Sequence, residues 1–396
     1  MSSTSVSILG TGMTDMSRRD LTPEAMAYQA LNEALIDASL DPNDLGLVIF
    51  SNALGGRLCD QGCIRGESWL RKAGLGEVPI INVDNSCASG SSALHLGTLI
   101  ASGDDRPILV LGVEKMWTGD RAGTIAGIED GLPSDYRADM HARFDPTNNP
   151  SGSILMGLND TWARQMIEDR GSSVEQVAAA AMKAHFHGSL NPLAQCQNKV
   201  TIQEVLESPQ VAGVLTRLMC SSFTDGAAAV ILGGKSLKPP SSSPRIVGSV
   251  AVSGNGEIDY HERLSHAAKL AWEEFEFGPS EVDLVELHDA TSAEELYALE
   301  SLGFFEPGEA GPATLAGKTT LGGSATTVNT SGGLVGRGHP LGATGIAQVV
   351  ELATQLRMRA GNRQLDGARL GVAFNTGGII EGDAAFIGAH AVAAGN

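Results

Sequence analysis

Apolar and polar positions follow the same order in the two halves of the chain. In the first half, an apolar strand pattern at 5–12 precedes a helical pattern at 24–40. In the second half, the same pair of patterns occupies 245–254 and 264–277. Each half continues with a loop leading into an apolar strand, then a glycine-rich turn that opens a helix of small residues, and closes on another apolar strand. This order predicts a duplicated α/β unit.

The segments between these patterns set the expected boundaries of the halves. The Pro- and Ser-rich stretch at 236–245 is typical of a linker and predicts halves at 1–235 and 245–396. Residues 115–200 interrupt the repeated order and are rich in Asp, Asn, Pro and Met, which predicts an inserted lobe over one end of the sheet. The strands are continuously apolar and alternate with helices, a pattern that favours mostly parallel sheets buried on both faces.

Residues able to do chemistry lie where the predicted strands end. In open α/β sheets, ligands bind at the carboxyl ends of the strands. The residues expected at these ends are Asn52, Cys87, His288, His339 and Asn375. The sequence therefore predicts a site that combines a thiol with two imidazoles.

Composition and charge restrict the classes of partner. The chain has 396 residues, of which 42% are apolar and 18% charged, as in globular proteins. Its net charge of −19 repels phosphate backbones, so we expect no binding to nucleic acid or to an anionic membrane. No apolar run reaches the length of a membrane span, and the N-terminal residues lack the pattern of a secretory signal. These features predict a cytoplasmic protein.

Cysteine usage argues against disulfides and structural metal. The five cysteines are scattered and odd in number, which does not indicate a disulfide framework. Cys59 and Cys63 have a C-x₃-C spacing without a second pair, so we expect no zinc site. No metal and no organic redox cofactor is predicted.

Cys87 lies in "NVDNSCASGSSAL", between a strand-like run and a small-residue helix. Taken alone, this segment favours a buried structural cysteine. The alternative is a nucleophile, because a thiol at a helix N-terminus faces unpaired N–H groups and the positive end of the helix dipole, which favour the thiolate. Its small neighbours would also leave room for a bulky acyl group.

Two histidines in the second half change the balance between these interpretations. His339 lies in the bare loop "GRGHPLGATG", and His288 follows a strand in "VELHDATS", with Asp289 as a possible hydrogen-bond partner. Either histidine alone is compatible with a packed, hydrogen-bonded residue. Together with Cys87 they supply what acyl transfer through a thioester needs: a nucleophile, a base and donors for an oxyanion.

The motifs around these residues resemble the signature segments of thiolases. The segments are "DNSCASGSSAL", "LHDA", "SGGLVGRGHPLGATG" and the glycine pair of "FNTGG". The most similar variety is the sterol-carrier-protein type and its archaeal and bacterial relatives, which the run at 183–232 also resembles. The resemblance covers nearly the whole chain. It implies an α/β fold of the thiolase kind, five-layered αβαβα with two similar halves, and a homodimer or tetramer.

The resemblance also implies roles for individual residues. Cys87 matches the acyl-accepting nucleophile, and His339 matches the base that activates it. His288 stands where many thiolases have an asparagine that holds an oxyanion-hole water, and the backbone N–H groups of Cys87 and Gly377 match the second oxyanion hole. The expected substrate-binding residues are Asn375, Ser331, Gly332, Ala290 and Thr291.

Two departures from the family pattern concern the acid/base that moves a proton at the α-carbon. Degradative thiolases have a second cysteine where this chain has Asn375, and sterol-carrier-protein types have it where this chain has Ala290. Thr291 stands where an aromatic residue is common, which suggests an altered pocket. Cys220 and His141 are candidates to replace the missing thiol.

The leading hypothesis is therefore an acyltransferase that takes an acyl group from acyl-CoA onto Cys87. The acceptor is CoA or a second thioester, by thiolysis or Claisen condensation, or a specialised carbon nucleophile. The alternatives are decarboxylative condensation of the ketoacyl-synthase kind, a carbon–carbon lyase that depends on a small OB-fold partner, and a non-catalytic lipid-binding subunit. Coenzyme A is expected as part of the substrate, with no further cofactor. The candidates for its phosphates are Arg57, Arg65, Lys199 and Arg337.

Overall fold

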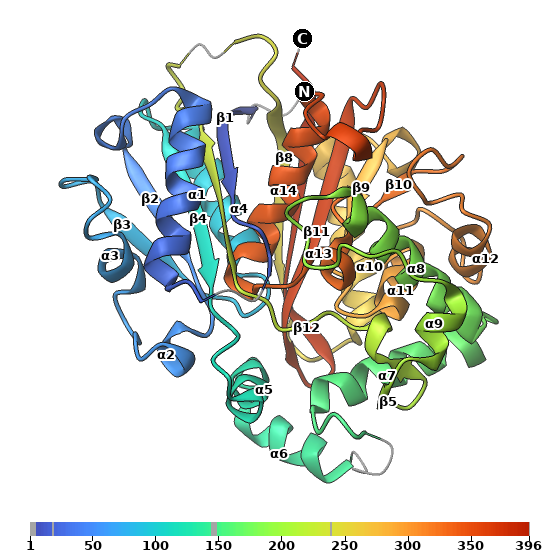
Figure 1. The fold of residues 1–396 in the computed structure, drawn as a ribbon. Coiled ribbons are helices and arrows are strands. Elements are labelled where there is room, and N and C mark those ends of the chain that lie inside the picture. The colour runs from blue at the N-terminus through green and yellow to red at the C-terminus, as the bar shows by residue number, and fades with distance from the viewer. Residues whose placement is uncertain (1–4, 18–19, 144–148, 238–239, 396) are drawn as a thin grey trace.

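A mixed β-sheet runs through the whole molecule. The computed structural model describes residues 5–17, 20–143, 149–237 and 240–395, so residues 238 and 239 of the predicted linker lie outside the described part. Within that part, ten strands form one sheet in the order β10-β9-β11-β12-β8-β1-β7-β4-β2-β3 (Figure 1). The strands are β1 (Val6–Met13), β2 (Leu47–Ser51), β3 (Ile80–Val83), β4 (Ile108–Glu114), β7 (Gly226–Leu232), β8 (Arg245–Ser253), β9 (Leu284–Glu286), β10 (Thr327–Val328), β11 (Leu370–Ile380) and β12 (Asp383–Ala393).

The sheet consists of two halves with the same strand arrangement. Read from the centre outward, the first half is β1-β7-β4-β2-β3 and the second is β8-β12-β11-β9-β10. The halves join where Val6 of β1 pairs with Ile246 of β8. Each position in one half has a counterpart in the other, which confirms the predicted duplication.

Strand direction agrees with the expectation of mostly parallel sheets except at one strand in each half. β2 is parallel to β3 and β4, and β9 is parallel to β10 and β11. However, β7 is antiparallel to β1 and β4, and β12 is antiparallel to β8 and β11. β4 and β7 are buried at every position. Four strands of each half therefore point the same way, and β7 and β12 are the reversed strands. A continuous apolar run follows from burial on both faces and does not reveal such a reversal.

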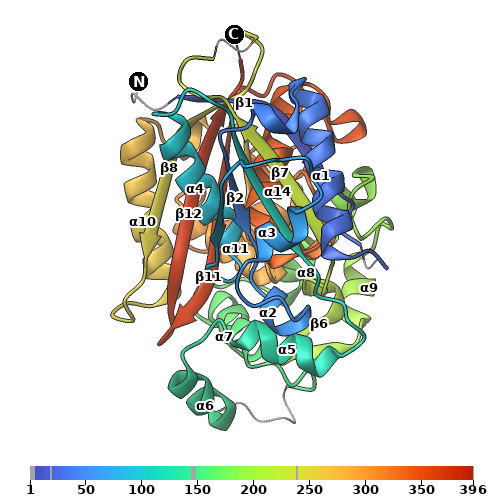
Figure 2. The same ribbon diagram turned by 90° about the vertical axis from the view of Figure 1, so that its left-hand side faces the viewer.

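Helices form the remaining layers around the sheet. They are α1 (Pro23–Ala38), α2 (Gly55–Leu58), α3 (Arg65–Leu70), α4 (Ser89–Ala101), α10 (Tyr260–Phe275), α11 (Ser292–Ser301), α12 (Ala310–Leu315), α13 (Gly333–Arg337) and α14 (Leu341–Leu356). α4 and α14 pack on each other and contact strands of both halves of the sheet. α1 covers the outer face of the first half, and α10 covers that of the second (Figure 2). The resulting order of layers is αβαβα.

Local capping determines where the outer helices begin. The Thr22 hydroxyl accepts a hydrogen bond from the backbone N–H of Ala25, directly before α1. Asp259 accepts from the backbone N–H groups of His261 and Glu262 at the start of α10. These side chains satisfy N–H groups that have no partner within the helix. Tyr260, the first residue of α10, is thereby placed at a defined point near the ends of the strands.

The inserted region extends beyond the predicted limit at residue 200. It lies between β4 and β7 and contains α5 (Arg121–Glu129), α6 (Ser134–Arg143), α7 (Ile154–Glu168), α8 (Val174–Leu190), α9 (Ile202–Glu207) and the hairpin of β5 (Gln210–Ala212) and β6 (Leu215–Thr216). α5, α6 and α7 lie below the lower end of the sheet in Figure 1. α8 instead packs against α11, α12 and α13. The alanine-rich α8 therefore packs on helices of the second half, although it belongs to the inserted region in sequence.

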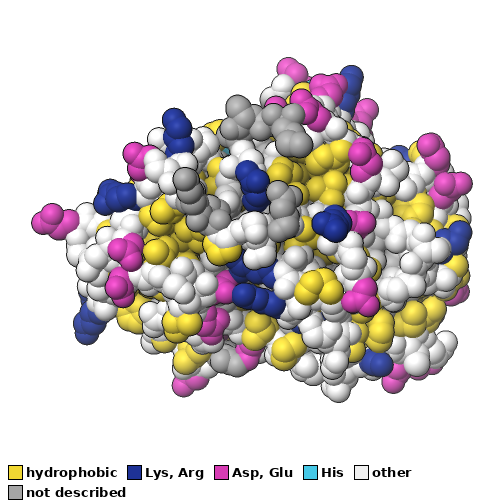
Figure 3. Space-filling model, turned by 90° about the horizontal axis from the view of Figure 1, so that it is seen from above, with side chains coloured by type: hydrophobic (Ala, Val, Ile, Leu, Met, Phe, Trp, Pro, Cys, Tyr) yellow, Lys and Arg dark blue, Asp and Glu magenta, His cyan; other side chains and the backbone are white. Residues whose placement is uncertain are grey.

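The surface has charges of both signs. On the face seen from above in Figure 3, Lys and Arg side chains are interspersed with Asp, Glu and hydrophobic side chains. Among the described helices, none combines the length and apolar character required to cross a membrane.

Candidate active site

The structure brings the predicted thiol and imidazoles together. Cys87 follows β3, His288 follows β9, and His339 precedes α14. The Cys87 sulfur and one ring nitrogen of each histidine lie within 4.8 Å of one another. The two imidazole rings are 5.1 Å apart between centroids and inclined by 88°. Among the described residues, this is the one group of three or more such side chains close enough to share an ion, and the arrangement equally suits a nucleophile with two proton-handling groups.

Small residues at the starts of α4 and α14 explain why Cys87 and His339 meet. A Cβ on Gly345 would lie 2.5 Å from the backbone nitrogen of Ser91, and one on Gly90 would lie 3.0 Å from the backbone of α14. The two helix N-termini are therefore in direct backbone contact, which side chains larger than hydrogen would prevent. Because each helix follows its functional residue, the contact brings the thiol beside the imidazole.

Hydrogen bonds from serine and asparagine side chains, together with bonds to the Asp84 carboxylate, hold the loop that presents Cys87. The Ser89 hydroxyl donates to the Ser86 carbonyl at 2.7 Å and accepts from the backbone N–H of Asn85 at 2.9 Å. The Asn85 amide donates to the Ser92 hydroxyl at 2.8 Å. Ser86 has a φ of 51°, a left-handed conformation that costs energy for a residue with a Cβ. The tight loop thus turns the chain at the residue before the thiol.

Hydrogen-bond partners assign opposite tautomers to the two histidines. Nδ1 of His339 lies 2.8 Å from the Thr344 hydroxyl, which itself donates to the Pro340 carbonyl. That hydroxyl must therefore accept a hydrogen bond from Nδ1–H of His339. Nε2 of His339 is then unprotonated and keeps a free lone pair. Nδ1 of His288 lies 3.0 Å from the amide nitrogen of Asn375, which can only donate, so Nε2 of His288 carries the proton. His339 is arranged as a base and His288 as a donor.

Burial keeps the three groups neutral at rest. It raises the pKa of the Cys87 thiol to about 12 and lowers the pKa of His288 to about 3. It also lowers the pKa of His339 well below 6.5, with the charges of His288 and Arg337 acting in the same direction. Desolvation, the largest of the influences on the Cys87 pKa, acts against the thiolate that the helix N-terminus was expected to favour. The base must therefore take the thiol proton as the sulfur attacks.

Gly377 brings strand β11 against the Cys87 loop. A Cβ at this position would lie 2.3 Å from the backbone nitrogen of Ala88 and 2.4 Å from the carbonyl of Asn85. Gly377 and Gly378 both line the cavity that contains Cys87. The strand thus places backbone, with no side chain, next to the thiol. The predicted role of the Gly377 backbone N–H as a donor to an oxyanion stays a prediction.

Cys87, His288 and His339 line one cavity of about 630 Å³. It lies between the ends of the strands and the inserted helices α5 and α7. Most of its wall is apolar and comes from Met116, Trp117, Ile125, Ile128, Leu132, Leu155, Met156, Trp162, Val211, Phe223, Leu341 and Ile379. This volume and lining suit a large apolar group attached to the thiol.

The polar residues of the cavity wall that were not predicted include Arg121, Arg217, Tyr260 and Glu294. Both arginines come from the inserted region, whose course the repeated pattern did not predict. Glu294 lies on α11. Its position four residues after Ala290, a predicted substrate-binding residue, was the sequence feature that could have indicated its place in the cavity wall. Asn159 of α7 also lines the cavity and accepts a hydrogen bond from Thr291 at 2.9 Å.

The predicted substrate-binding residues fall into two groups. Ala290 lines the cavity. Thr291 and Asn375 are buried directly behind it, bonded to Asn159 and His288 respectively. Asn375 lies in the middle of β11, not at a strand end. The direct contact expected for Ser331 and Gly332 has no support in the geometry, because neither lines the cavity.

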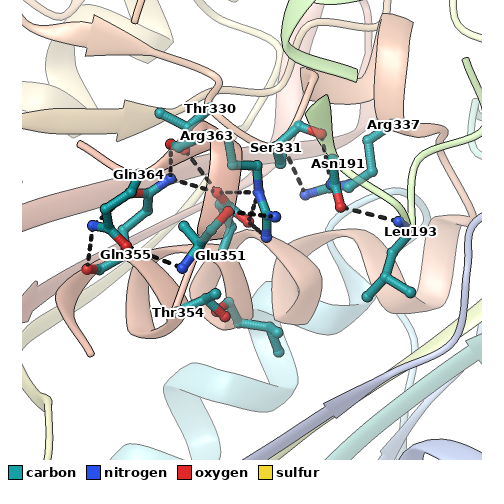
Figure 4. A network of polar contacts seen from close by, with 12 residues as sticks. Asn191, Leu193, Thr330, Ser331, Arg337, Glu351, Thr354, Gln355, Arg363 and Gln364 are labelled. Atoms are coloured by element: carbon teal, nitrogen blue, oxygen red, sulfur yellow. Dashed lines mark hydrogen bonds and ion pairs between the residues drawn. The ribbon is translucent and has the colours of Figure 1, made fainter. Parts of the chain in front are cut away.

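A buried network of charges surrounds the loop between β10 and α14. The Ser331 hydroxyl donates to Glu286, and Arg337 lies 3.7 Å from the same carboxylate. Figure 4 shows this region together with Glu351 and Arg363, which form a paired ionic contact. Arg337 is fully buried, so the expectation that it binds CoA phosphates was wrong. Its role here is to hold the loop that leads to His339.

The other expected phosphate ligands also lie outside the cavity wall. Arg57 pairs with Asp130, Arg65 pairs with Asp84, and Lys199 lies over the Phe186 ring. None of the three cations is among the residues that line the cavity.

Three further candidates have defined surroundings. Asn52 donates to Glu114 at 2.7 Å and does not reach the cavity. His141 is half exposed, pairs with Glu129 at 3.2 Å and also lies outside the cavity. Cys220 does line the cavity, and all five cysteines are free thiols.

Comparison with known proteins agrees with this arrangement. The family model "Thiolase, N-terminal domain" matches residues 6–236, and "Thiolase C-terminal domain-like" matches residues 249–389. An acetyl-CoA acetyltransferase of Methanothermobacter thermautotrophicus is 35% identical over 388 residues, covering 94% of this chain and 96% of that protein. Sterol carrier protein 2 of Oryctolagus cuniculus is 32% identical over 393 residues, covering 94% of this chain and 70% of that protein.

A solved structure shows the same fold. A chain of the Ltp2-ChsH2(DUF35) aldolase superposes with a TM-score of 0.79 at 18% identity, over 98% of both chains. At this identity the similarity concerns the fold alone.

Proposed function

This chain belongs to the thiolase family and is an acyltransferase, and we propose that it works through an acyl group carried on the sulfur of Cys87. One observation supports this most strongly: the Cys87 sulfur and the two imidazole nitrogens lie within 4.8 Å of one another, and the histidines have opposite tautomers. A base and a donor therefore face the same thiol.

In the first step, the thiol attacks the carbonyl carbon of an acyl-CoA. Nε2 of His339 takes the thiol proton while the carbon–sulfur bond to Cys87 forms. The oxyanion accepts hydrogen bonds from the backbone N–H groups of Cys87 and Gly377, and such donors each stabilise a transition state by about 3–4 kcal/mol. The bond to CoA then breaks, and the CoA sulfur leaves with the proton that His339 took.

In the second step of a condensation, the acyl group moves from the Cys87 sulfur to a carbon nucleophile. Nε2–H of His288 donates to the thioester oxygen of the second substrate, which stabilises negative charge on that oxygen. The low pKa of His288, about 3 because of burial, keeps it a neutral donor throughout. Thiolysis runs both steps in reverse: Cys87 attacks the 3-oxo carbon of a 3-oxoacyl-CoA, the carbon–carbon bond breaks to release an acyl-CoA enolate, and the acyl group on Cys87 then moves to CoA.

The substrate is an acyl-CoA with a bulky apolar acyl group. The apolar wall and the volume of about 630 Å³ support this. Arg121 and Arg217 lie in the same wall and replace the four expected cations as candidates to bind the CoA phosphates. The missing second cysteine favours an acceptor carbon that loses its proton readily.

A second candidate function is decarboxylative condensation. The Cys87, His288 and His339 set supports it, because ketoacyl synthases resemble this arrangement with one cysteine and two histidines. Release of carbon dioxide from a malonyl thioester would favour it, and its absence together with thiolysis of a 3-oxoacyl-CoA would exclude it.

Association with other chains is part of the proposal. β3 forms one end of the sheet, and Ile81 on it is 42% exposed, which supports a homodimer formed at this edge. Light scattering on the purified protein tests this. A small OB-fold partner is a further possibility in the proposal, supported by the two-component name of the Ltp2-ChsH2(DUF35) aldolase.

Intact-mass measurement with a panel of acyl-CoAs tests the proposed mechanism. We expect a mass increase equal to one acyl group, located on Cys87 by peptide mapping and absent from the Cys87→Ala variant. The same panel orders acyl groups by size. Wild-type protein that binds acyl-CoA without any mass increase would overturn the acyl-enzyme proposal.

A further inference from the structure

Formation of a carbon–carbon bond requires a group that takes a proton from the α-carbon of the second substrate. Neither of the two positions expected for this group contains a thiol, because they are Ala290 and Asn375. Among the described residues that line the cavity, Glu294 has the one carboxyl group. It is 3% exposed, so its presence in the wall of an apolar cavity requires an explanation.

Three contacts hold the Glu294 carboxyl beside the vacant position. Oε2 accepts a hydrogen bond from the backbone N–H of Ala290 at 3.1 Å. Oε1 accepts from the Tyr260 hydroxyl at 2.5 Å, and that hydroxyl also lies 2.5 Å from the hydroxyl of Thr376. Thr376 immediately precedes Gly377, next to the Cys87 loop. The carboxyl is thus fixed against the backbone of residue 290, where the side chain is a single methyl group.

The carboxyl is also close enough to the nucleophile for their charges to interact. After burial, the charge of Glu294 is one of the influences that raise the pKa of the Cys87 thiol. Burial raises the pKa of Tyr260 most, and the charge of Glu294 and then that of Cys87 act in the same direction. Glu294, Tyr260 and Cys87 therefore share one electrostatic environment at the floor of the cavity.

We propose that Glu294 is the acid/base that moves the α-carbon proton in the carbon–carbon bond step, and this assignment rests on the proposed acyl-Cys87 chemistry. Tyr260 acts as a positioning residue that holds the carboxyl. The methyl side chain of Ala290 leaves the space through which the carboxyl reaches the substrate.

The ionisation of Glu294 agrees with this role. Burial raises its pKa to about 7, against the opposing hydrogen bonds from Tyr260, Ala290 and Thr291. A group that titrates near neutral pH can both take and return a proton.

Cys220 is the rival candidate in the same wall. Its sulfur donates to the Thr216 carbonyl at 3.4 Å, and burial raises its pKa to about 12. A thiol with this pKa and this partner is a poorer base near neutral pH than a carboxyl with a pKa of about 7. The geometry therefore favours Glu294.

The carbon–carbon bond step begins with transfer of a proton to Glu294 and ends with return of that proton to Cys87. The Glu294 carboxylate takes a proton from the α-carbon of the second acyl-CoA, and an enolate forms whose oxygen accepts from His288. The enolate carbon attacks the carbonyl carbon of acyl-Cys87, so a carbon–carbon bond forms and the bond to the Cys87 sulfur breaks. The proton held by Glu294 finally reaches that sulfur. The net products are a 3-oxoacyl-CoA and the free thiol, with no oxidant or reductant consumed.

Glu294→Gln tests the proposal because glutamine keeps the size and one acceptor oxygen while removing the base. Three quantities are measured: acylation of Cys87 by intact mass, exchange of the α-proton of a saturated acyl-CoA for deuterium, and formation of 3-oxoacyl-CoA. We expect acylation to stay within about threefold of wild type, whereas exchange and condensation fall by about 100-fold or more. Glu300→Gln is the matched control, since it makes the same change on the same helix outside the cavity, and should leave all three unchanged.

Further variants keep the test decisive. Glu294→Asp should restore part of the exchange, whereas Cys220→Ala should leave it within about threefold of wild type. Should Glu294→Gln fail to fold, as circular dichroism would reveal, a partial fall in exchange in folded Glu294→Asp at unchanged acylation serves instead. Full exchange in folded Glu294→Gln, or its loss in Cys220→Ala, would overturn the assignment. Absence of acylation in wild-type protein would instead refute the proposed function, so the two failures are distinguishable.

Discussion

The two halves of the molecule deliver different functional groups from equivalent places and hold them by different means. In the first half, the chain leaves β3, presents Cys87 and enters α4. In the second half, it leaves β10, passes through α13, presents His339 and enters α14. Serine and asparagine hydrogen bonds and the exposed Asp84 carboxylate hold the first loop, whereas buried carboxylates and guanidinium groups hold the second.

The difference follows from what each loop must present. The Cys87 loop is short, and the charge that supports it, on Asp84, is exposed to solvent, which weakens its effect on the ionisation of the thiol. The loop before His339 is longer and contains glycines that do not favour one conformation, so a stronger set of contacts is required to define it. Arg337 in that set also helps to keep His339 neutral. The two copies of the duplicated unit thus present a nucleophile and a base, and they differ in the residues that hold the loop before each helix.

Replacement of either presented residue should have the largest effect. We expect Cys87→Ala to abolish acylation and His339→Ala to slow it by about 10⁴-fold, because nucleophile and base act as one unit. Rapid-quench measurement of the acyl-enzyme checks this. Cys196→Ala is the control, since Cys196 lies outside the cavity. A His339→Ala variant with near-normal acylation would show that the second half does not supply the base.

Loss of one charge from the buried network that supports the second loop should mainly affect stability. Arg363→Met leaves Glu351 buried without its paired guanidinium, which is expected to cost about 3–5 kcal/mol. Urea unfolding measures the change in the free energy of unfolding. Arg57→Met is the matched control, because its pair with Asp130 is exposed and should contribute about 1 kcal/mol or less. Equal losses in the two variants would contradict a special role for the buried network.

The sequence predicted the duplicated unit and the residues that each half presents, because both depend on local order. Small residues around Gly90 and Gly345 and the motifs at Cys87 and His339 are readable from neighbouring positions. The reversed direction of β7 and β12 was not readable, since full burial gives the same apolar run in either direction. Glu294 was missed because its role depends on Tyr260, which reaches it from a different helix. The arginines of the cavity were missed because they lie in an insertion without a counterpart.

Removal of a neutral bond from the first loop should have a smaller effect. Ser92→Ala deletes the acceptor of the Asn85 amide, which should lower the free energy of unfolding by about 1 kcal/mol. Acylation should slow only a few-fold, because Ser89 still holds the loop. Ser102→Ala at the exposed end of the same helix is a suitable control. A loss as large as that of Arg363→Met would mean that the two loops do not differ in how they are held.

The smallest expected effect is that of pH on acylation, and it tests whether both loops present neutral groups. Burial lowers the pKa of His339 well below 6.5, so the imidazole stays unprotonated and able to act as a base as the pH falls through 6.5. The pKa of Cys87, about 12, places thiolate formation far above the neutral range. The rate of acylation should therefore change less than about twofold between pH 6 and pH 8. Stopped-flow measurement of CoA release checks this, with enzyme stability confirmed at each pH. A tenfold fall in the acylation rate below pH 6.5 would mean that His339 titrates like a solvent-exposed histidine. The second half would then not shield this imidazole from water.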